Sequence, residues 1–259
     1  MEILKINGLT KDFGGLRAIN NVDLNINQQE IVGLIGPNGA GKTTLFNVIT
    51  GVFPPTTGEI FFGKERISDL RTYQIVEKGV GRTFQQIRLF LNLSVIENVM
   101  AGQHPRTQTG FLGAIVGGRK VSQEEERISK KALDVLEQVG LLDRKNELAK
   151  NLAYGHRKLL EIARALATEP FLLLIDEPTS GLNPAETEEV MVLLQHIRKN
   201  GVTLFIIEHH MKAIMKISDR IVVLDRGSKI FDGLPKDAQQ DNQVISAYLG
   251  KELRHVNSR

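Results

Sequence analysis

The residues of this chain with the most specific chemistry follow the pattern G-x-x-x-x-G-K-[ST]. They are, in order, Gly36, Pro37, Asn38, Gly39, Ala40, Gly41, Lys42, Thr43 and Thr44. Glycines let successive backbone N–H groups turn towards one phosphate, and a following helix N-terminus adds its partial positive charge. Lys42 is then placed to reach the β- and γ-phosphates, and the Thr43 hydroxyl can ligate Mg²⁺. The segment predicts a binding site for a nucleoside triphosphate.

Two acidic residues follow an apolar run later in the chain. The run Phe171–Ile175 reads as a strand and is followed directly by Asp176 and Glu177. A parallel strand buried on both faces is nearly all apolar, and ligands bind beyond its carboxyl end. Asp176 is therefore placed to hold Mg²⁺ through water, and Glu177 to polarise an attacking water. A strand followed by a helix-capping acid would explain one carboxylate, but not two beside a phosphate loop.

The elements that must position these residues alternate between strands and helices. Ile31–Ile35 reads as a buried strand that enters the phosphate loop, and Leu45–Thr50 as the first turns of the helix that leaves it. Helices are predicted over 157–168, after Pro184 and from His210. Strands are predicted between and after them, at Phe171–Ile175, Val202–Ile207 and Arg220–Asp225. This alternation favours a largely parallel sheet covered by helices.

The first half of the chain has a different pattern. Apolar alternation and turn residues predict strands at Ile3–Ile6, Val22–Ile26, Glu59–Gly63 and Val80–Gln85. Further along, Ser94 and Glu97 suit a capping box, and Ser122–Gly140 has a helical pattern that ends at a glycine. We expect a loop or short insertion over His104–Lys120, which is rich in glycine, threonine and basic residues. A helical insertion over about 89–164 thus interrupts the strand–helix alternation.

Composition limits the kinds of protein this chain can be. With 259 residues, 41% apolar and 24% charged, it can form one large or two modest domains. It has no cysteine, which excludes disulfides and thiolate metal sites and fits a cytosolic protein. We see no signal-peptide pattern and no apolar run near the ~18 residues of a spanning helix, so work at a membrane would need a spanning partner. The net charge of +3 does not imply nucleic acid, and we expect no such partner.

The motifs stand in the order found in ATP-binding cassette (ABC) ATPases, which the chain resembles over nearly its full length. The guanine-specifying pattern N-K-x-D of small GTPases is absent, which also favours ATP. The resemblance implies that Phe13 stacks on adenine, that Gln85 helps to ligate Mg²⁺ and that His209 contacts the γ-phosphate. It further implies a D-loop made of Ser180, Gly181, Leu182 and Asn183. The place of the family's signature motif is taken by Leu152, Ala153, Tyr154, Gly155 and His156.

The resemblance also implies a fold class and a division of the chain. The class is α/β: a P-loop NTPase (RecA-like) core with a mainly parallel sheet, an N-terminal antiparallel β subdomain and an inserted α-helical subdomain. We expect residues 1–88 and 165–235 to form the ATP-binding core with the β subdomain, 89–164 the helical signature subdomain, and 236–259 a C-terminal helical tail. ATP and Mg²⁺ are the expected cofactors. The metal ligands would be Thr43, Gln85 and Asp176, and the catalytic side chains Glu177, His209 and Gln85.

The signature segment departs from the family's usual Leu-Ser-Gly-Gly-Gln. Ala153 replaces the serine, Tyr154 the first glycine and His156 the glutamine. In the family this segment contacts the γ-phosphate of ATP bound to the other subunit of a dimer. The missing hydroxyl takes away a charge-assisted hydrogen bond worth roughly 1.5–3 kcal/mol, whereas the Gly155 backbone and the following helix N-terminus persist. The sequence leaves open whether the opposing site is active with altered chemistry or degenerate.

Two further positions need a choice or carry a change. Both His209 and His210 follow Glu208, and the family places its switch histidine one residue beyond such an acid. We therefore assign the switch to His209 and expect His210 to be an exposed first-turn residue of the next helix. Asn183 replaces the aspartate that is more usual in the D-loop, which loses a charge but keeps a hydrogen-bonding group.

Several short segments resemble the larger ATPase subunit of branched-chain amino-acid importers. They are Arg82–Gln85, Leu152–Gly155, the insert after Ala101–His104, Ile207–His209 and Ala247–Gly250. The implied partners are a homologous ATPase subunit in a homo- or heterodimer, two transmembrane permease subunits and a solute-binding protein, at the cytoplasmic face of the cell membrane. The alternatives are an ABC ATPase for another solute such as urea or amides, a soluble non-transport ABC ATPase, and a regulatory module that binds nucleotide without hydrolysis.

Overall fold

A six-stranded sheet lies at the centre of the computed structural model, which describes residues 1–85, 87–104 and 119–248. Its strands are β3 (Ile31–Ile35), β6 (Val80–Arg82), β7 (Leu172–Asp176), β8 (Thr203–Ile207), β9 (Arg220–Asp225) and β10 (Ser228–Gly233). Their order is β10-β9-β3-β8-β7-β6, with β10 antiparallel to β9 and all other pairs parallel. The carboxyl ends of the parallel strands therefore meet at one edge, where ligands of α/β sheets bind.

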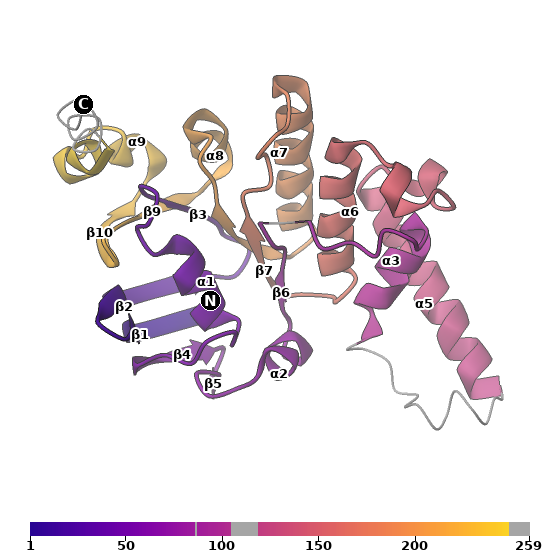
Figure 1. The fold of residues 1–259 in the computed structure, drawn as a ribbon, viewed down its shortest axis with the longest axis horizontal. Coiled ribbons are helices and arrows are strands. Elements are labelled where there is room, and N and C mark those ends of the chain that lie inside the picture. Colours follow the sequence, from indigo (N-terminus) through magenta and orange to yellow (C-terminus); the bar gives the residue numbers. More distant parts are fainter. Residues whose placement is uncertain (86, 105–118, 249–259) are drawn as a thin grey trace.

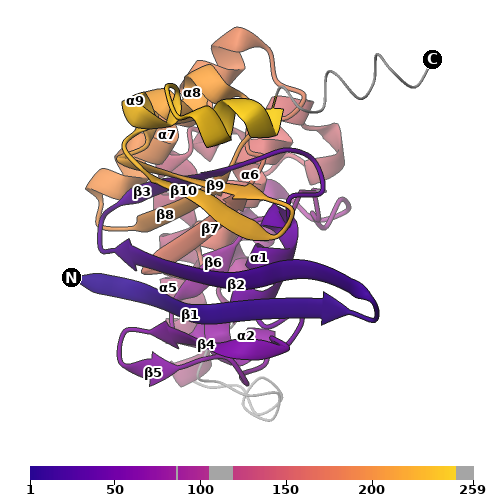
Figure 2. The same ribbon diagram turned by 90° about the vertical axis from the view of Figure 1, so that its left-hand side faces the viewer.

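The N-terminal part of the chain adds a separate antiparallel sheet with the order β2-β1-β4-β5 (Figure 2). Its strands are β1 (Glu2–Phe13), β2 (Leu16–Asn27), β4 (Thr57–Phe62) and β5 (Glu65–Arg66). β1 and β2 form a long hairpin in which Leu4 pairs with Ile26 and Ile6 with Leu24. Buried and exposed residues alternate over Val22–Ile26 of β2, as expected for a sheet with one face on the core, whereas β1 buries the neighbouring pairs Ile3–Leu4 and Leu9–Thr10.

Helices cover the six-stranded sheet and extend beyond one end of it (Figure 1). They are α1 (Lys42–Ile49), α2 (Thr72–Glu77), α3 (Val95–Gly102), α5 (Arg119–Gln138), α6 (Tyr154–Leu166), α7 (Pro184–Lys199), α8 (Met211–Ile217) and α9 (Pro235–Ala238). Short 3-10 helices span Leu142–Arg144 and Ala149–Asn151. Helices α3, α5 and α6 pack against one another at the end of the molecule next to β6 and β7. No helix in the described ranges is long and apolar enough to cross a lipid bilayer.

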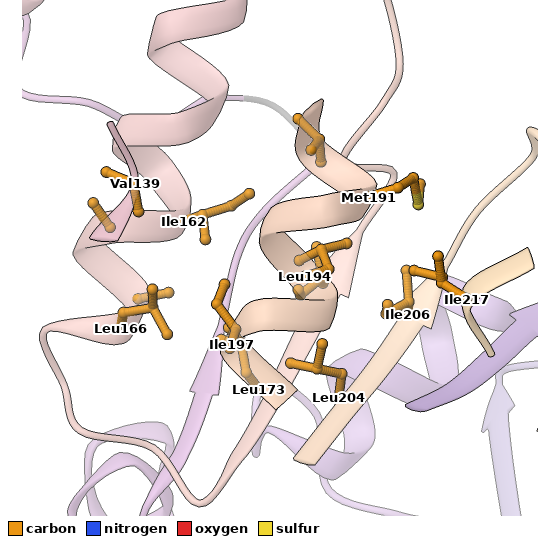
Figure 3. Close-up of a cluster of buried hydrophobic side chains, with 14 of the residues drawn as sticks. Val139, Ile162, Leu166, Leu173, Met191, Leu194, Ile197, Leu204, Ile206 and Ile217 are labelled. Atoms are coloured by element: carbon orange, nitrogen blue, oxygen red, sulfur yellow. The ribbon is translucent and has the colours of Figure 1, made fainter. Parts of the chain in front are cut away.

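The six-stranded sheet has a hydrophobic core on each face. Leu173, Leu204 and Ile206 point to one face and pack against α7, which contributes Leu194 and Ile197 (Figure 3). Their neighbours along the strands point to the opposite face and pack with α1 and the antiparallel sheet; Phe205, for example, lies 5.0 Å from Phe46 between ring centroids. Burial on both faces explains why β3, β7 and β8 are almost continuously apolar.

The predicted fold class is confirmed by these two sheets and by the helices inserted between β6 and β7. The capping box is confirmed as well: the Ser94 N–H donates to Glu97 Oε2 (2.7 Å), and the Glu97 N–H donates to Ser94 Oγ (3.3 Å). The division of the chain into domains stays a prediction. Residues 105–118 of the expected loop and 249–259 of the expected helical tail lie outside the described residues; before them, the tail contains α9 and a helix over 242–248.

Several boundaries differ from the prediction. The strand predicted over Val80–Gln85 ends at Arg82, because the Phe84 N–H donates to the Glu161 side chain (3.0 Å) rather than to a neighbouring strand. The helix predicted from residue 157 begins at Tyr154, and the one predicted from residue 122 begins at Arg119. The sequence patterns gave no signal for α2, β5 or β10, which are short or only partly buried.

Candidate functional site

The phosphate loop joins the carboxyl end of β3 to the N-terminus of α1. Gly36 and Gly41 have φ values of 148° and 104°, in the region that favours glycine. A Cβ at Gly36 would lie 2.1 Å from the Leu224 carbonyl oxygen, and one at Gly41 would lie 2.6 Å from the Ala18 carbonyl oxygen. Both glycines are thus required by close backbone contacts with β9 and β2. The two glycines of the G-x-x-x-x-G-K-[ST] pattern are therefore needed for this backbone packing as well as for phosphate binding.

The N-terminus of α1 is suited to an anion. Gly41 is its N-cap residue, no described side chain caps the helix, and no acidic residue stands in its first turn. Its first N–H groups therefore combine with the helix dipole to favour a negative charge. Lys42 is buried, at 6% exposed, and its Nζ donates to the carbonyl oxygens of Gly36 (2.7 Å) and Pro37 (3.1 Å). Its positive charge is thereby held inside the curve of the loop.

A cavity of about 990 Å³ opens in front of this loop. Residues 38–44 of the loop line it, together with Gln85, Glu177 and His209. These three side chains come from the segments that follow β6, β7 and β8, which are neighbouring strands. The strand order therefore gathers at one cavity residues that are far apart in the sequence.

Glu177 is the meeting point of these side chains. Its Oε1 accepts a hydrogen bond from Gln85 Nε2 (3.1 Å) and lies 3.1 Å from His209 Nε2. Glu177 has a φ of 50°, uncommon for a residue with a side chain, and its N–H donates to the Ile207 carbonyl (2.9 Å). The arrangement places a carboxylate in direct contact with an imidazole and an amide at the mouth of the phosphate loop. The adjacent His210 is exposed and is the N-cap residue of α8, rather than its first-turn residue.

Asp176 lies directly before Glu177 at the end of β7 and is only 1% exposed. Neither of its carboxylate oxygens has a hydrogen-bond partner among the described residues, and Arg82 Nη2 lies 3.6 Å from Oδ2. Burial raises the pKa of Asp176, and the nearby Arg82 opposes that rise. A buried carboxylate that accepts no hydrogen bond from the described residues, next to a phosphate loop, is a fitting ligand for a hydrated cation.

The buried Glu208 holds the loops around Glu177 in place, a function that sequence reasoning missed. Its Oε2 accepts from the Thr179 hydroxyl (2.8 Å) and the Thr179 N–H (3.2 Å). Its Oε1 accepts from the backbone N–H groups of His209 (2.8 Å) and His210 (3.0 Å). The carboxylate therefore fixes the histidine loop to the segment after Glu177. The available signal in the sequence was an acidic residue directly after an apolar strand. From the sequence alone, Glu208 served only to choose between His209 and His210.

The segment Leu152–His156 is absent from the described residues that line the cavity. It leads into α6, whose N-cap residue Ala153 provides no side-chain cap among the described contacts. Tyr154 is 47% exposed, and its ring lies against Gly181 of the predicted D-loop. Also in that loop, Asn183 caps α7 by accepting from the N–H groups of Ala185 (2.9 Å) and Glu186 (3.0 Å). The amide thus retains the capping function of an aspartate.

Phe13 does not line the cavity. It is 40% exposed, packs edge-on against Phe53 with 5.3 Å between ring centroids, and has Lys11 Nζ 5.0 Å from its own centroid. The lining of the cavity instead includes residues that belong to none of the predicted motifs: Leu16, Arg17, Ala18, Arg226 and Gly227. The turn between β9 and β10 is tied to the phosphate loop, because the Gly227 N–H donates to the Ala40 carbonyl (3.0 Å).

Comparison with known proteins identifies the family. The sequence model described as ABC transporter matches residues 19–180, which is more than half of the chain. This chain belongs to the ABC transporter family. The ABC protein is 44% identical over 250 residues to the high-affinity branched-chain amino acid transport ATP-binding protein LivG of Escherichia coli (strain K12). That alignment covers 96% of this chain and 98% of LivG.

Solved structures agree with this assignment. The ABC protein matches the ADP conformation of an ATP-binding cassette of an ABC transporter with a TM-score of 0.85 and 31% identity, over 96% of this chain and 99% of that chain. It also matches the dimeric post-hydrolysis state of a cassette bound to ADP and Pi, with a TM-score of 0.76 and 28% identity over 90% and 99% of the two chains. The family and fold predicted from the sequence are confirmed.

Proposed function

We propose that this chain is the ATP-hydrolysing subunit of an ABC importer that powers uptake of branched-chain amino acids (leucine, isoleucine and valine) through a separate membrane permease. The observation that carries the proposal is the 44% identity to LivG across 96% of the chain and 98% of that relative, with the phosphate loop and both acids in place. The expected partners are a homologous ATPase subunit, two permease subunits and a solute-binding protein. The chain would lie at the cytoplasmic face of the membrane, held there by the permease.

In the proposed reaction the phosphate loop binds the triphosphate of ATP. The N–H groups at the start of α1 and the buried Lys42 offset the negative charge of the β- and γ-phosphates. Lys42 exchanges hydrogen bonds to the Gly36 and Pro37 carbonyls for bonds to phosphate oxygens. This exchange requires little movement, because the ammonium group already lies inside the loop.

Glu177 orients the attacking water, and its neighbours hold it in place. Gln85 and His209 both approach the same oxygen, Oε1, which leaves Oε2 of the carboxylate for the water. The water attacks the γ-phosphorus, the bond to the β-phosphate oxygen breaks, and ADP and phosphate are formed. His209 is placed to stabilise the charge on the γ-phosphate oxygens as this bond breaks.

The residues proposed to hold Mg²⁺ fit that ion. Asp176 has two buried oxygens without a hydrogen-bond partner among the described residues, and Thr43 and Gln85 line the cavity beside it. Mg²⁺ prefers oxygen ligands and is usually held by one or two carboxylates, substrate phosphates and water. Bound there, the ion would neutralise part of the phosphate charge. The carboxylate, hydroxyl and amide of this chain would fix its position.

The second half of each ATP site is proposed to come from a partner subunit. Leu152–His156 does not reach this chain's own cavity, and a dimeric cassette matches the fold. Ala153 offers no hydroxyl to the partner's ATP, whereas the uncapped N-terminus of α6 still offers N–H groups. We therefore expect the pair of sites to be unequal when the partner subunit has a complete signature.

Reconstitution tests the proposal. The complex of this chain with its ATPase partner, permease and binding protein, in proteoliposomes, should take up radiolabelled leucine only with internal ATP. Lys42→Ala should abolish uptake, whereas Glu189→Gln, at an exposed position of α7, should not change it. Uptake of urea or an amide in place of leucine would contradict the solute class. A complex that hydrolyses ATP without moving any solute would contradict the transport function.

A further inference from the structure

Helix α6 buries two ionisable side chains that take no part in the proposed reaction. Lys158 is 2% exposed and Glu161 is 7% exposed, and they lie three residues apart. Burial of a charged group is costly unless hydrogen bonds compensate for the lost water. The hydrogen-bond partners of Lys158 and Glu161 therefore indicate which parts of the chain these side chains hold in place.

Glu161 holds the segment that carries Gln85. The Phe84 N–H donates to Glu161 Oε1 (3.0 Å), one residue before Gln85 and two residues after β6 ends. Further along the same segment, Arg164 Nη1 donates to the Arg88 carbonyl. Helix α6 thus holds the chain on both sides of Gln85, with contacts to its backbone.

Lys158 holds the residue that meets Gln85. Its Nζ donates to the backbone carbonyl of Glu177 (3.2 Å). Glu177 has the positive φ described above, a backbone conformation that residues with side chains adopt uncommonly and that contacts around it must hold. The ammonium group supplies one such contact, and the Glu177 side chain meets Gln85 at 3.1 Å.

We propose that Lys158 and Glu161 are positioning residues that lock α6 to Glu177 and to the Gln85 segment of the same chain. Helix α6 begins one residue after Ala153, within the segment Leu152–His156 that is proposed to face a partner subunit's ATP. The same helix contacts Glu177 and the Gln85 segment, which serve the ATP bound by this chain. The identity of the second site rests on the proposed function, whereas the two contacts do not.

Variants of Glu161 test the contact to Phe84. Glu161→Ala removes the acceptor, whereas Glu161→Gln keeps an oxygen for the Phe84 N–H; Glu189→Gln is the control for loss of an exposed charge. In the assembled complex, we expect Glu161→Ala to lower kcat about tenfold and to change KM for ATP less than about twofold, with Glu161→Gln close to wild type. In the full chain alone, amide hydrogen exchange around Phe84 should speed up only in Glu161→Ala.

The outcomes separate this inference from the proposed function. A wild-type complex that hydrolyses no ATP would overturn the proposed function, and exchange at Phe84 in the full chain would still test the contact. Exchange and kcat in Glu161→Ala equal to those of Glu189→Gln would overturn the positioning role. Faster exchange spread evenly over the whole chain would overturn it too, because that result indicates general destabilisation.

Variants of Lys158 provide a second test. Lys158→Met keeps the length and most of the apolar stem but removes the donor to the Glu177 carbonyl, and Lys158→Arg restores a donor. We expect Lys158→Met to lower kcat about tenfold while ATP affinity stays within about threefold, and Lys158→Arg to recover part of that loss. A loss of ATP affinity in Lys158→Met, with kcat unchanged, would overturn the role.

Discussion

Oε1 of Glu177 lies 3.1 Å from Nε2 of His209, although the two residues follow different strands of the sheet. The contact is possible because β7 and β8 are adjacent and parallel, so their carboxyl ends meet. It distinguishes His209, which lines the cavity, from the neighbouring His210, which is the N-cap residue of α8 and is not part of that lining.

Replacement of His209 should therefore affect hydrolysis and replacement of His210 should not. We expect His209→Ala to lower kcat by about 10²-fold, since it removes a group placed to stabilise charge on the γ-phosphate. His210→Ala, one residue away, is the matched control. Steady-state phosphate release in the assembled complex measures both. Equal losses in the two variants would show that the assignment between the histidines is wrong.

Glu177→Gln should separate binding from hydrolysis. The amide keeps an oxygen for Gln85 and the shape of the side chain, but it cannot act as a base towards water. We expect ATP affinity within about threefold of wild type and hydrolysis reduced by about 10²-fold or more. Filter binding of labelled ATP and single-turnover kinetics measure the two quantities, and near-normal turnover would refute the role of the carboxylate.

Loss of Glu208 should destabilise the fold around the site. Its side chain accepts four hydrogen bonds, from the Thr179 hydroxyl and from three backbone N–H groups. Glu208→Ala leaves these donors without their acceptor, so we expect the free energy of unfolding to fall by about 2–4 kcal/mol. Urea denaturation measures it, with Glu189→Ala as an exposed control. An unchanged midpoint would mean that water replaces the carboxylate at no cost.

Ala153→Ser should change both the stability of the chain and the ATP turnover of the complex. Ala153 is the N-cap residue of α6 without a side-chain cap, so the hydroxyl of Ala153→Ser can accept from a first-turn N–H and stabilise the chain by about 1 kcal/mol. In the complex it also restores a donor towards ATP in the opposing site, where we expect faster hydrolysis. Thermal denaturation of the chain and ATP turnover of the complex are the measurements. Added stability with unchanged turnover would favour a degenerate opposing site.

Stability should depend on pH through Glu161. Burial raises the pKa of this carboxyl from 4.5 to about 7, against the opposing effects of the Phe84 N–H, Lys158 and Arg164 and with a further rise from Asp176. Between these pKa values the folded chain holds a proton that the unfolded chain has lost. The free energy of unfolding therefore falls as pH rises from about 4.5 to 7, by at most about 1.4 kcal/mol per pH unit.

Glu161→Gln isolates this contribution, because both chains keep Asp176 and every other titrating group. We expect the variant to gain stability relative to wild type as pH increases from 5 to 7.5. Urea unfolding of the nucleotide-free chains, without Mg²⁺, at several pH values measures the difference. Parallel pH profiles for the two chains would show that the Glu161 carboxyl titrates normally in the folded state.

The sequence by itself determined the phosphate loop, the paired acids after an apolar strand and the family. These features are local: glycines fix a backbone path, and a buried parallel strand is apolar until it ends in its functional residues. Strand and helix types were predictable from residue period for the same reason. Boundaries failed where a distant side chain took a backbone group, as Glu161 does with the Phe84 N–H.

Only the tertiary structure decided which residues meet. Glu177 contacts Gln85 and His209 because β6, β7 and β8 are neighbours, and no local pattern encodes that order. The same holds for the border of the cavity at Leu16–Ala18 and Arg226–Gly227, and for Phe13, which packs on Phe53 outside the lining. Such contacts depend on how two sheets and α6 pack together. Their energies belong to the assembled core rather than to any one segment.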